Sequence, residues 1–359
     1  MSAALETPYL RVDPAALERN LAEVADACAA HGVALRPHVK THKCATIARR
    51  QLALGAAGLT CAKLSEAEVL ARNGCDDLFV CYPLVGAERL RRLRDLASAV
   101  RVRTIVDSEA GARGLSEAFA DGPPLDVLVK LDVGMHRAGV APADAPALAS
   151  AVARLPGLRL RGVCIHEGSV YGEVDPGKRA QIARAQVGAL VATAEALRRD
   201  GHEIDVVSAG ATPAWRTSVA VPGVTELRPG NYVFYDAMQA ALGVVGLDRC
   251  ALTVETTVVS HAAPDRALVD AGSKVFTVDR GAHGGGLLEG YGAVVGRPGI
   301  RVASLSEEHG WLRLDPSERV AIGDRLRIVP NHACPVVAHF DELIVGDGRW
   351  PVEARGCLT

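Results

Sequence analysis

The sequence predicts an α/β protein in which a (β/α)8 barrel of the TIM type is followed by an antiparallel β domain. Two observations lead to this fold class. Short apolar segments alternate with helical segments over roughly the first 240 residues, and short β-type segments separated by Gly, Pro or Asp turns follow. We therefore expect a barrel domain at residues 13–240 and a β-rich domain at residues 241–359, to which residues 1–12 add a strand.

The helices of the barrel domain have recognisable start and stop signals. Asp13 suits an N-cap and Pro14 the first helical position, and Gly32 ends the apolar run that follows. A capping box from Ser65 to Glu68 predicts another helix after the second barrel strand. The alternation continues along the chain, as a barrel requires.

Eight apolar segments have the length expected of buried parallel strands. A doubly wound sheet is the competing architecture, but its Gly-x-Gly-x-x-Gly fingerprint does not follow the first strand. The β-rich domain is expected to contain further strands at residues 254–260, 266–270, 292–296, 311–314 and 325–329. The expected barrel strands are residues 34–40, 58–63, 77–83, 101–107, 126–132, 160–166, 205–210 and 226–232.

Composition and charge exclude several classes of protein. Lys and Arg number 40 against 42 Asp and Glu, with no basic block, so a nucleic-acid partner is not expected. The N-terminus has no signal-peptide pattern, and no apolar run is long enough to predict a membrane span. Nine scattered cysteines without a Cys-x-x-Cys motif are typical of a reduced, cytoplasmic protein.

Lys40 is the strongest candidate for a nucleophile. It lies at the carboxyl end of the first barrel strand, within a cluster of basic residues. Barrel enzymes place their functional residues at that end, and a lysine there suits Schiff-base chemistry with a carbonyl compound. The alternative is a strand that ends in a solvated basic turn. Lys63 also ends a strand but continues directly into a helix, so we regard it as secondary.

Two glycine-bearing segments follow the seventh and eighth strands, where barrels commonly bind phosphate. They are residues 208–212 and 229–232, which supply backbone N–H groups and hydroxyls. Either segment alone is weak evidence, because glycines are common in loops. Together with Lys40, they predict a site for pyridoxal 5'-phosphate.

His332 and Cys334 are candidate metal ligands in the β-rich domain. If residues 330–335 form a strand, these two side chains point the same way and can meet one ion. Imidazole and thiolate suit Zn²⁺, and two protein ligands leave positions open for catalysis. The alternative is an interior histidine beside a buried cysteine. Residues 306–309 are a less specific candidate for lining a pocket, with a polar turn as the alternative, and residues 281–286 are expected to form a flexible turn.

These motifs together resemble the D-serine dehydratase / D-threonine aldolase family of pyridoxal phosphate enzymes, which have the alanine racemase fold. The resemblance spans nearly the whole chain. It implies a barrel, a C-terminal β domain and a homodimer with a shared active site. The segments that carry it are residues 36–43, 63–68, 134–139, 229–236, 306–310 and 330–335.

The resemblance also implies a role for each matched residue. Lys40 would hold the cofactor as a Schiff base, Arg137 would lie near its phenolic oxygen, and His166 would lie against its pyridine ring. His332 and Cys334 would bind the metal. The remaining cofactor-binding residues, mainly around the phosphate, would be Ser208, Thr212, Gly230, Asn231 and Tyr232.

The His-x-Cys spacing favours the dehydratase branch, because aldolases of the family tend to have His-x-Asp. The expected reaction is β-elimination from a D-β-hydroxy amino acid, which gives a 2-oxo acid and ammonia. Retro-aldol cleavage to glycine and an aldehyde is the first alternative, and amino-acid racemisation is the second. A non-catalytic pyridoxal-binding protein is a third, which the large β domain disfavours. Cysteine favours zinc, with Mn²⁺ or Mg²⁺ as alternatives.

Overall fold

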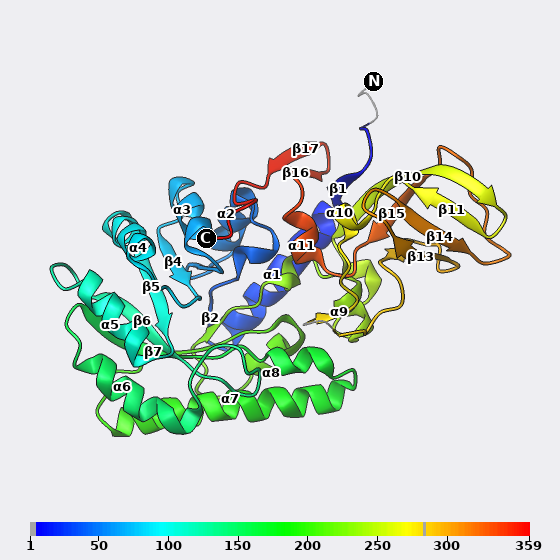
Figure 1. Cartoon of the computed structure of the whole chain (residues 1–359). Helices are drawn as coiled ribbons and strands as arrows, with labels where there is room; N and C mark the ends of the chain where they lie inside the picture. The colour runs from blue at the N-terminus through cyan, green and yellow to red at the C-terminus, as the bar shows by residue number, and fades with distance from the viewer. Residues whose placement is uncertain (1–4, 283–284) are drawn as a thin grey trace. The chain divides into compact units, whose positions relative to one another are not determined.

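The computed structural model describes residues 5–282 and 285–359, which form two compact units. The barrel unit comprises residues 22–40, 47–230 and 357–359. The β unit comprises the described part of residues 1–21, together with residues 41–46 and 231–356. Figure 1 shows the course of the chain through both units. These units are defined by contacts within the chain. The domain boundary expected at residue 240 stays a prediction.

The barrel unit is built on a parallel sheet, which within the described residues has eight strands in the order β2-β9-β8-β7-β6-β5-β4-β3. A parallel bridge between His38 and Thr60 joins the chain after β2 to β3, so the sheet closes on itself. The (β/α)8 prediction is confirmed. The strands are β2 (Ala34–Leu35), β3 (Leu59–Cys61), β4 (Asp77–Val80), β5 (Arg101–Val106), β6 (Leu125–Lys130), β7 (Leu158–Cys164), β8 (Val206–Ala209) and β9 (Glu226–Leu227).

Helices separate the barrel strands (Figure 1). Several of them begin at side-chain caps. The Asp13 carboxylate accepts hydrogen bonds from the N–H groups of Ala15 and Ala16, as predicted. Asp175 caps the long helix α7 by accepting from the Lys178 N–H. These helices are α1 (Pro14–Ala30), α2 (Ala45–Ala53), α3 (Leu64–Arg72), α4 (Ala87–Ala99), α5 (Glu109–Ala118), α6 (Ala145–Ala153), α7 (Pro176–Arg199) and α8 (Trp215–Ser218).

The capping box predicted at Ser65 is wrong. Lys63 is the N-cap of α3, and it makes no side-chain cap. The Ser65 hydroxyl instead donates to the backbone oxygen of Thr359, and Glu66 accepts from the Ala62 N–H. The helix therefore begins two residues earlier than the pattern indicated, and Ser65 binds the backbone of Thr359 instead of capping the helix.

The β unit contains a mixed sheet in the order β11-β14-β13-β12-β15-β10-β1-β16-β17, with β11 also paired to β10. That extra pairing closes the first six strands into a small barrel. β1 adds to it antiparallel to β10, with Tyr9 opposite Glu255. The strands are β1 (Tyr9–Val12), β10 (Leu252–Ala263), β11 (Arg266–Val269), β12 (Ala293–Val294), β13 (Ile300–Leu305), β14 (Gly310–Leu314), β15 (Arg325–Val329), β16 (Glu342–Val345) and β17 (Gly348–Pro351).

Short helical turns carry half of the candidate site residues. Three of them follow strands of the barrel unit: η1 (Val39–Thr41), η3 (Gly168–Gly172) and η4 (Thr212–Ala214). The β unit contains η5 (Asn231–Val233), α9 (Ala237–Ala241), α10 (Ser273–Phe276) and α11 (Ala333–Val337). Among the described helices, none is long and apolar enough to cross a membrane.

Candidate active site

Lys40 lies on the turn η1 rather than on a long strand. β2 ends at Leu35, and the chain then runs beside the segment after β9, where the His38 N–H donates to the Pro229 oxygen at 3.0 Å. Lys40 is half-buried. Its charge acts on His166 and Cys81, which follow other strands of the barrel. Lys40 therefore lies beyond the carboxyl end of β2, near His166 and Cys81, although its strand is shorter than predicted.

His166 follows β7 and is a neutral imidazole. Its Nδ1 donates to the Gly210 carbonyl oxygen at 2.8 Å, which fixes the tautomer. Burial, helped by the charges of Lys40 and Lys130, lowers its pKa well below the usual range. A neutral, oriented ring at the barrel mouth suits contact with a planar ligand.

Arg137 lies in the loop that follows β6, where it is exposed. The Asp132 carboxylate orders this loop by accepting from the N–H groups of Gly134, Met135 and His136. The Arg137 guanidinium contributes to lowering the pKa of His166. The loop therefore presents Arg137 towards the same mouth as Lys40 and His166.

The segments after β8 and β9 are packed closely together. The Gly210 N–H donates to Glu167 Oε2 at 2.9 Å, and Ser218 Oγ donates to the other oxygen of that carboxylate. A Cβ on Gly210 would lie 2.7 Å from the Arg228 carbonyl carbon, so only glycine fits. Thr212 begins η4 and is buried, as is Gly230 at the end of the neighbouring segment.

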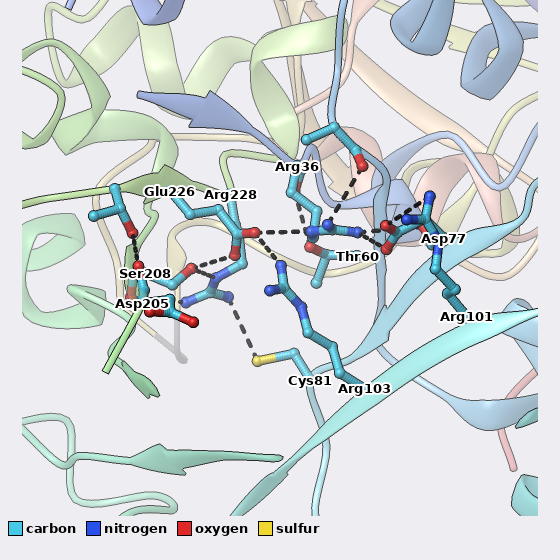
Figure 2. A network of polar contacts seen from close by, with 12 residues as sticks. Arg36, Thr60, Asp77, Cys81, Arg101, Arg103, Asp205, Ser208, Glu226 and Arg228 are labelled. Carbon is cyan, nitrogen blue, oxygen red and sulfur yellow. Dashed lines mark hydrogen bonds and ion pairs between the residues drawn. The ribbon is translucent and has the colours of Figure 1, made fainter. Parts of the chain in front are cut away.

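Ser208 is engaged in a buried polar network that Figure 2 shows. Its hydroxyl donates to Glu226 Oε1 and accepts from Arg228 Nε, both at 2.7 Å. The Ser208 hydroxyl therefore uses both its donor and an acceptor position on residues inside the barrel. This arrangement argues against the expected direct contact of Ser208 with a phosphate.

Glu226 is the centre of that network. It is buried, and it pairs with Arg36 at 2.8 Å and with Arg103. Arg36 also pairs with Asp77 at 2.5 Å (Figure 2). Burial alone would raise the pKa of Glu226, but the charges of Arg103 and Arg36 outweigh it and lower the pKa. Glu226, Asp77 and Arg101 are the first residues of β9, β4 and β5.

Arg228 links that network to the strand ends. Its guanidinium donates to the Ile165 oxygen at 2.5 Å and to Cys81 Sγ at 3.4 Å. A hydrogen bond with Cys164, followed by the charges of Arg228 and Lys130, lowers the pKa of Cys81 well below its usual range, against the effect of burial. Sequence reasoning missed this group, because the side chains that form it come from four separate strands.

Lys130, the last residue of β6, was also missed. It is 6% exposed, and its Nζ has no hydrogen-bond partner within the part of the chain that the structure describes. Burial lowers its pKa, which the nearby Cys164 and Cys81 oppose. A buried amine without a partner is rare unless a ligand completes the site. The signal in the sequence was a lysine that directly follows the apolar residues 127–129 at the end of a strand.

His332 and Cys334 lie in the β unit, but not on a strand. His332 is the N-cap of helix α11, so the predicted strand at residues 330–335 is wrong. The two side chains still meet, because His332 makes a hydrogen bond to Cys334. His332 Nδ1 also lies 2.8 Å from Asp279 Oδ2, and Cys334 Sγ lies 3.1 Å from Thr41 Oγ1. The start of helix α11 therefore brings the two side chains together, whereas the sequence analysis expected a strand to do so.

The pKa of His332 is raised to about 10. Burial alone would lower it, but the Cys334 charge and the hydrogen bonds to Asp279 and Cys334 outweigh burial. The negative charges of Cys334 and Asp279 favour positive charge at this position, whether it is a proton on His332 or a metal cation that displaces that proton. Within the described residues there is no group of three or more His, Cys, Asp or Glu side chains that could hold a metal ion. Two protein ligands would therefore leave coordination positions open.

Asp236 fixes the segment that carries His332 and Cys334. It accepts hydrogen bonds from the Ala333 N–H at 3.0 Å and from Asn231 Nδ2 at 2.5 Å. The Asn231 amide thus serves the β unit, and Tyr232 beside it is fully buried. Backbone groups, rather than these side chains, are what this turn offers to a ligand. Of the glycine-rich candidate at residues 281–286, residues 283–284 lie outside the described residues.

Comparisons with known proteins agree on one family. A model of the alanine racemase N-terminal domain matches residues 12–237, and a model of a putative serine dehydratase domain matches residues 251–346. The chain is 35% identical to a D-threonine aldolase of Arthrobacter sp., with 99% of this chain and 94% of the relative covered. It is 36% identical to a D-threo-3-hydroxyaspartate dehydratase of Delftia sp., with 96% and 95% covered.

Solved structures show the same likeness. A D-threonine aldolase from Filomicrobium marinum superimposes with a TM-score of 0.90 at 36% identity, covering 99% of this chain and 97% of that one. The Delftia dehydratase superimposes with a TM-score of 0.89 at 34% identity, covering 97% of each chain. An alanine racemase from Clostridium difficile, at 14% identity, a TM-score of 0.68 and coverage of 97% and 98%, shares the fold.

Proposed function

Because the chain belongs to the family that joins an alanine racemase N-terminal domain to a serine dehydratase domain, we propose that it is a pyridoxal phosphate- and metal-dependent lyase of D-β-hydroxy amino acids. The observation that carries this proposal is the His332–Cys334 pair, held by Asp279 and Thr41. A racemase of this fold would not need a metal pair.

The barrel unit suits an anionic, planar cofactor. Lys40, Lys130 and Arg228 bring positive charge to one end of the barrel, and Lys130 Nζ has no partner among the described residues. A phosphate and a phenolic oxygen would supply the missing negative charge. Neutral His166 offers a ring face beside these cations. The charges, the lysine and the close-packed glycine loops all fit pyridoxal phosphate.

Each candidate residue then has a place in cofactor binding. Lys40 would form the Schiff base, Arg137 would meet the phenolic oxygen, and His166 would lie against the ring. Thr212, Gly230 and Asn231 would hold the phosphate, the last two through backbone N–H groups. We leave Ser208 out, because its hydroxyl is engaged with Glu226 and Arg228. Tyr232 would act by packing, since it is fully buried.

The bound cofactor supplies an electron sink for negative charge at the substrate Cα. The chain's own residues handle the protons and the leaving group. The Lys40 amine would be the general base that removes the α-proton. His332 and Cys334 would hold a divalent cation, zinc by preference, which as a Lewis acid makes the β-hydroxyl a better leaving group. The α-proton and the β-hydroxyl would leave together as water, and hydrolysis of the resulting enamine would give a 2-oxo acid and ammonia.

The dehydratase activity is proposed ahead of the aldolase activity on the strength of Cys334. Structures of the Delftia dehydratase include variants in which a histidine and a cysteine, two positions apart, are replaced by alanine, and the cysteine variant is described as metal-free. This chain has the same spacing at His332 and Cys334. Retro-aldol cleavage at the same site is the second candidate, which the identity to the Arthrobacter aldolase supports.

Product analysis tests the proposal. Protein loaded with pyridoxal phosphate and Zn²⁺ is incubated separately with D-serine, D-threonine and D-threo-3-hydroxyaspartate. A 2-oxo acid with an equal amount of ammonia is the expected result. Glycine with an aldehyde would establish the aldolase instead. D/L interconversion without cleavage would show that both lyase reactions are wrong.

Two further properties belong to the same proposal. A homodimer with a shared active site is expected from the family, and light scattering during gel filtration would measure it. A cytoplasmic location is supported by the cysteines, since all nine are free thiols.

A further inference from the structure

The carboxylate of Asp279 contacts the imidazole of His332 directly. Asp279 Oδ2 lies 2.8 Å from His332 Nδ1, although the two residues are 53 positions apart in the chain. Asp279 follows helix α10, and His332 precedes helix α11. Both side chains are partly accessible, at 42% for Asp279 and 29% for His332. The contact therefore lies at the edge of the β unit rather than in its core.

This contact determines which ring nitrogen is available. An ionised carboxylate only accepts hydrogen bonds, so Nδ1 must carry the proton. In the neutral imidazole, Nε2 then keeps its lone pair. A histidine that binds a metal through one nitrogen commonly donates from the other to a carboxylate. The geometry at His332 matches that arrangement.

A second contact holds the backbone of Asp279 near its partner. Asn331, the residue before His332, donates from Nδ2 to the Asp279 carbonyl oxygen at 2.9 Å. The same amide donates to the Gly290 carbonyl oxygen at 2.9 Å. Asn331 is buried, at 2% exposed. The aspartate is therefore fixed through its main chain, which leaves its carboxylate free to orient the ring.

We propose that Asp279 is the positioning residue of the metal pair, which fixes the tautomer and orientation of His332 so that Nε2 faces the cation bound by Cys334. This inference rests on the proposed metal role of the pair. Asp279 acts through His332 and is not itself a ligand, because its carboxylate is directed to Nδ1. The absence of a three-residue ligand group within the described part of the chain agrees with this role.

Metal affinity tests the inference independently of activity. The Zn²⁺ dissociation constant of the full-length protein is measured by competition with a chromophoric chelator. Asp279→Ala should weaken binding by about 10- to 100-fold. Asp279→Asn should have a smaller effect, because its amide oxygen still accepts from Nδ1. Asp347→Asn, at an exposed turn of the same unit, is the matched control and should bind as the parent does.

Two more variants separate this inference from the proposed function. His332→Ala and Cys334→Ala should each lose Zn²⁺ binding. If both retain it, the proposed metal pair is wrong. If both lose it while Asp279→Ala binds zinc as tightly as the parent, the metal pair stands and the positioning role of Asp279 is refuted.

Cobalt substitution distinguishes positioning from a general loss of structure. At saturating Co²⁺, Asp279→Ala should keep the thiolate charge-transfer band from Cys334 but change the visible ligand-field bands. Its melting temperature without metal should equal that of the parent. A Co²⁺ spectrum identical to that of the parent would contradict the proposal. If Asp279→Ala does not fold, Asp279→Asn decides, and parental affinity and spectrum in that variant would overturn the inference.

Discussion

The two ends of the barrel unit differ in whether their buried charged side chains are paired. Near the strand starts, Glu226 is paired with Arg36 and Arg103, and Arg36 is paired with Asp77 (Figure 2). At the strand ends, Lys130 is buried with no hydrogen-bond partner among the described residues. Within the described residues, a single barrel thus contains a network of paired charges and a buried amine that forms no ion pair or hydrogen bond.

This difference suggests that the paired charges stabilise the fold and that Lys130 serves ligand binding. A buried charge without a partner is costly, and proteins keep one mainly where a ligand or a reaction uses it. Removing Glu226 should therefore damage the fold, whereas removing the Lys130 charge should damage ligand binding and leave the fold intact. The predictions below test this contrast, from the largest expected effect to the smallest.

Lys40→Ala should abolish activity and the absorbance of lysine-bound cofactor. Loss of the general base alone lowers turnover by about 10²- to 10⁴-fold, and loss of the Schiff base adds to that. Turnover and the visible spectrum measure the effect. The matched control is Lys63→Ala, which removes the other strand-end lysine, whose Nζ lies over the Tyr82 ring. A parental spectrum in Lys40→Ala would refute the role of Lys40.

Glu226→Gln should destabilise the protein, because it leaves Arg36 and Arg103 buried without their counter-charge. The expected loss in the free energy of unfolding is about 3–5 kcal/mol. Urea denaturation measures it, with Glu88→Gln on the exposed surface of α4 as the control. An unchanged urea midpoint would show that the network does not stabilise the fold.

The same carboxylate predicts a pH dependence. Because the folded protein lowers the pKa of Glu226, its contribution to stability is fully present above its ordinary pKa of 4.5 and is lost as pH falls through the lower folded value. The parent should therefore lose stability more steeply in acid than Glu226→Gln does. Parallel acid curves for the two proteins would contradict this assignment.

Lys130→Met should weaken cofactor binding while keeping the fold. A hydrogen bond to a charged group contributes about 1.5–3 kcal/mol, so the dissociation constant should rise roughly 10- to 100-fold. Its unfolding free energy should equal or exceed that of the parent, because a buried amine without a partner is removed. Cofactor titration and urea denaturation together measure the contrast. Parental cofactor affinity would mean that Lys130 does not face the cofactor.

Ser208→Ala should have the smallest effect. It removes the hydroxyl between Glu226 and Arg228, at a cost of about 1–2 kcal/mol in stability. Cofactor affinity should not change, since the structure uses this hydroxyl inside the barrel. A clear loss of cofactor affinity would restore Ser208 to the phosphate site.

Local patterns in the sequence were enough to predict the barrel. Most of the eight strands contain a short apolar run, and Asp13 caps the first helix as its sequence predicts. In the β unit, β13 (Ile300–Leu305) was missed, because alternate residues such as Arg301 are exposed and the apolar signal is weak. Strands were easier to predict where both faces of the sheet are buried, because most of their residues are then apolar.

The sequence predicted individual residues of the site but not the contacts between them. The strand-end rule selected Lys40 and His166, which the structure brings to one barrel mouth. Asp279 contacts His332, and Lys130 interacts electrostatically with Cys81 and Cys164. Both interactions join residues far apart in the chain, so no local pattern could reveal them. Ser208 is the opposite case. It lies at the predicted position, but its hydroxyl bonds Glu226 and Arg228 inside the barrel.

The most direct test of the central claim is the product formed from D-serine by intact and metal-stripped protein, both loaded with pyridoxal phosphate. The account predicts pyruvate and ammonia from the intact protein, loss of both after chelation, and recovery when Zn²⁺ is restored. Undiminished pyruvate formation after complete metal removal, verified by elemental analysis, would contradict the role of His332 and Cys334 in the reaction.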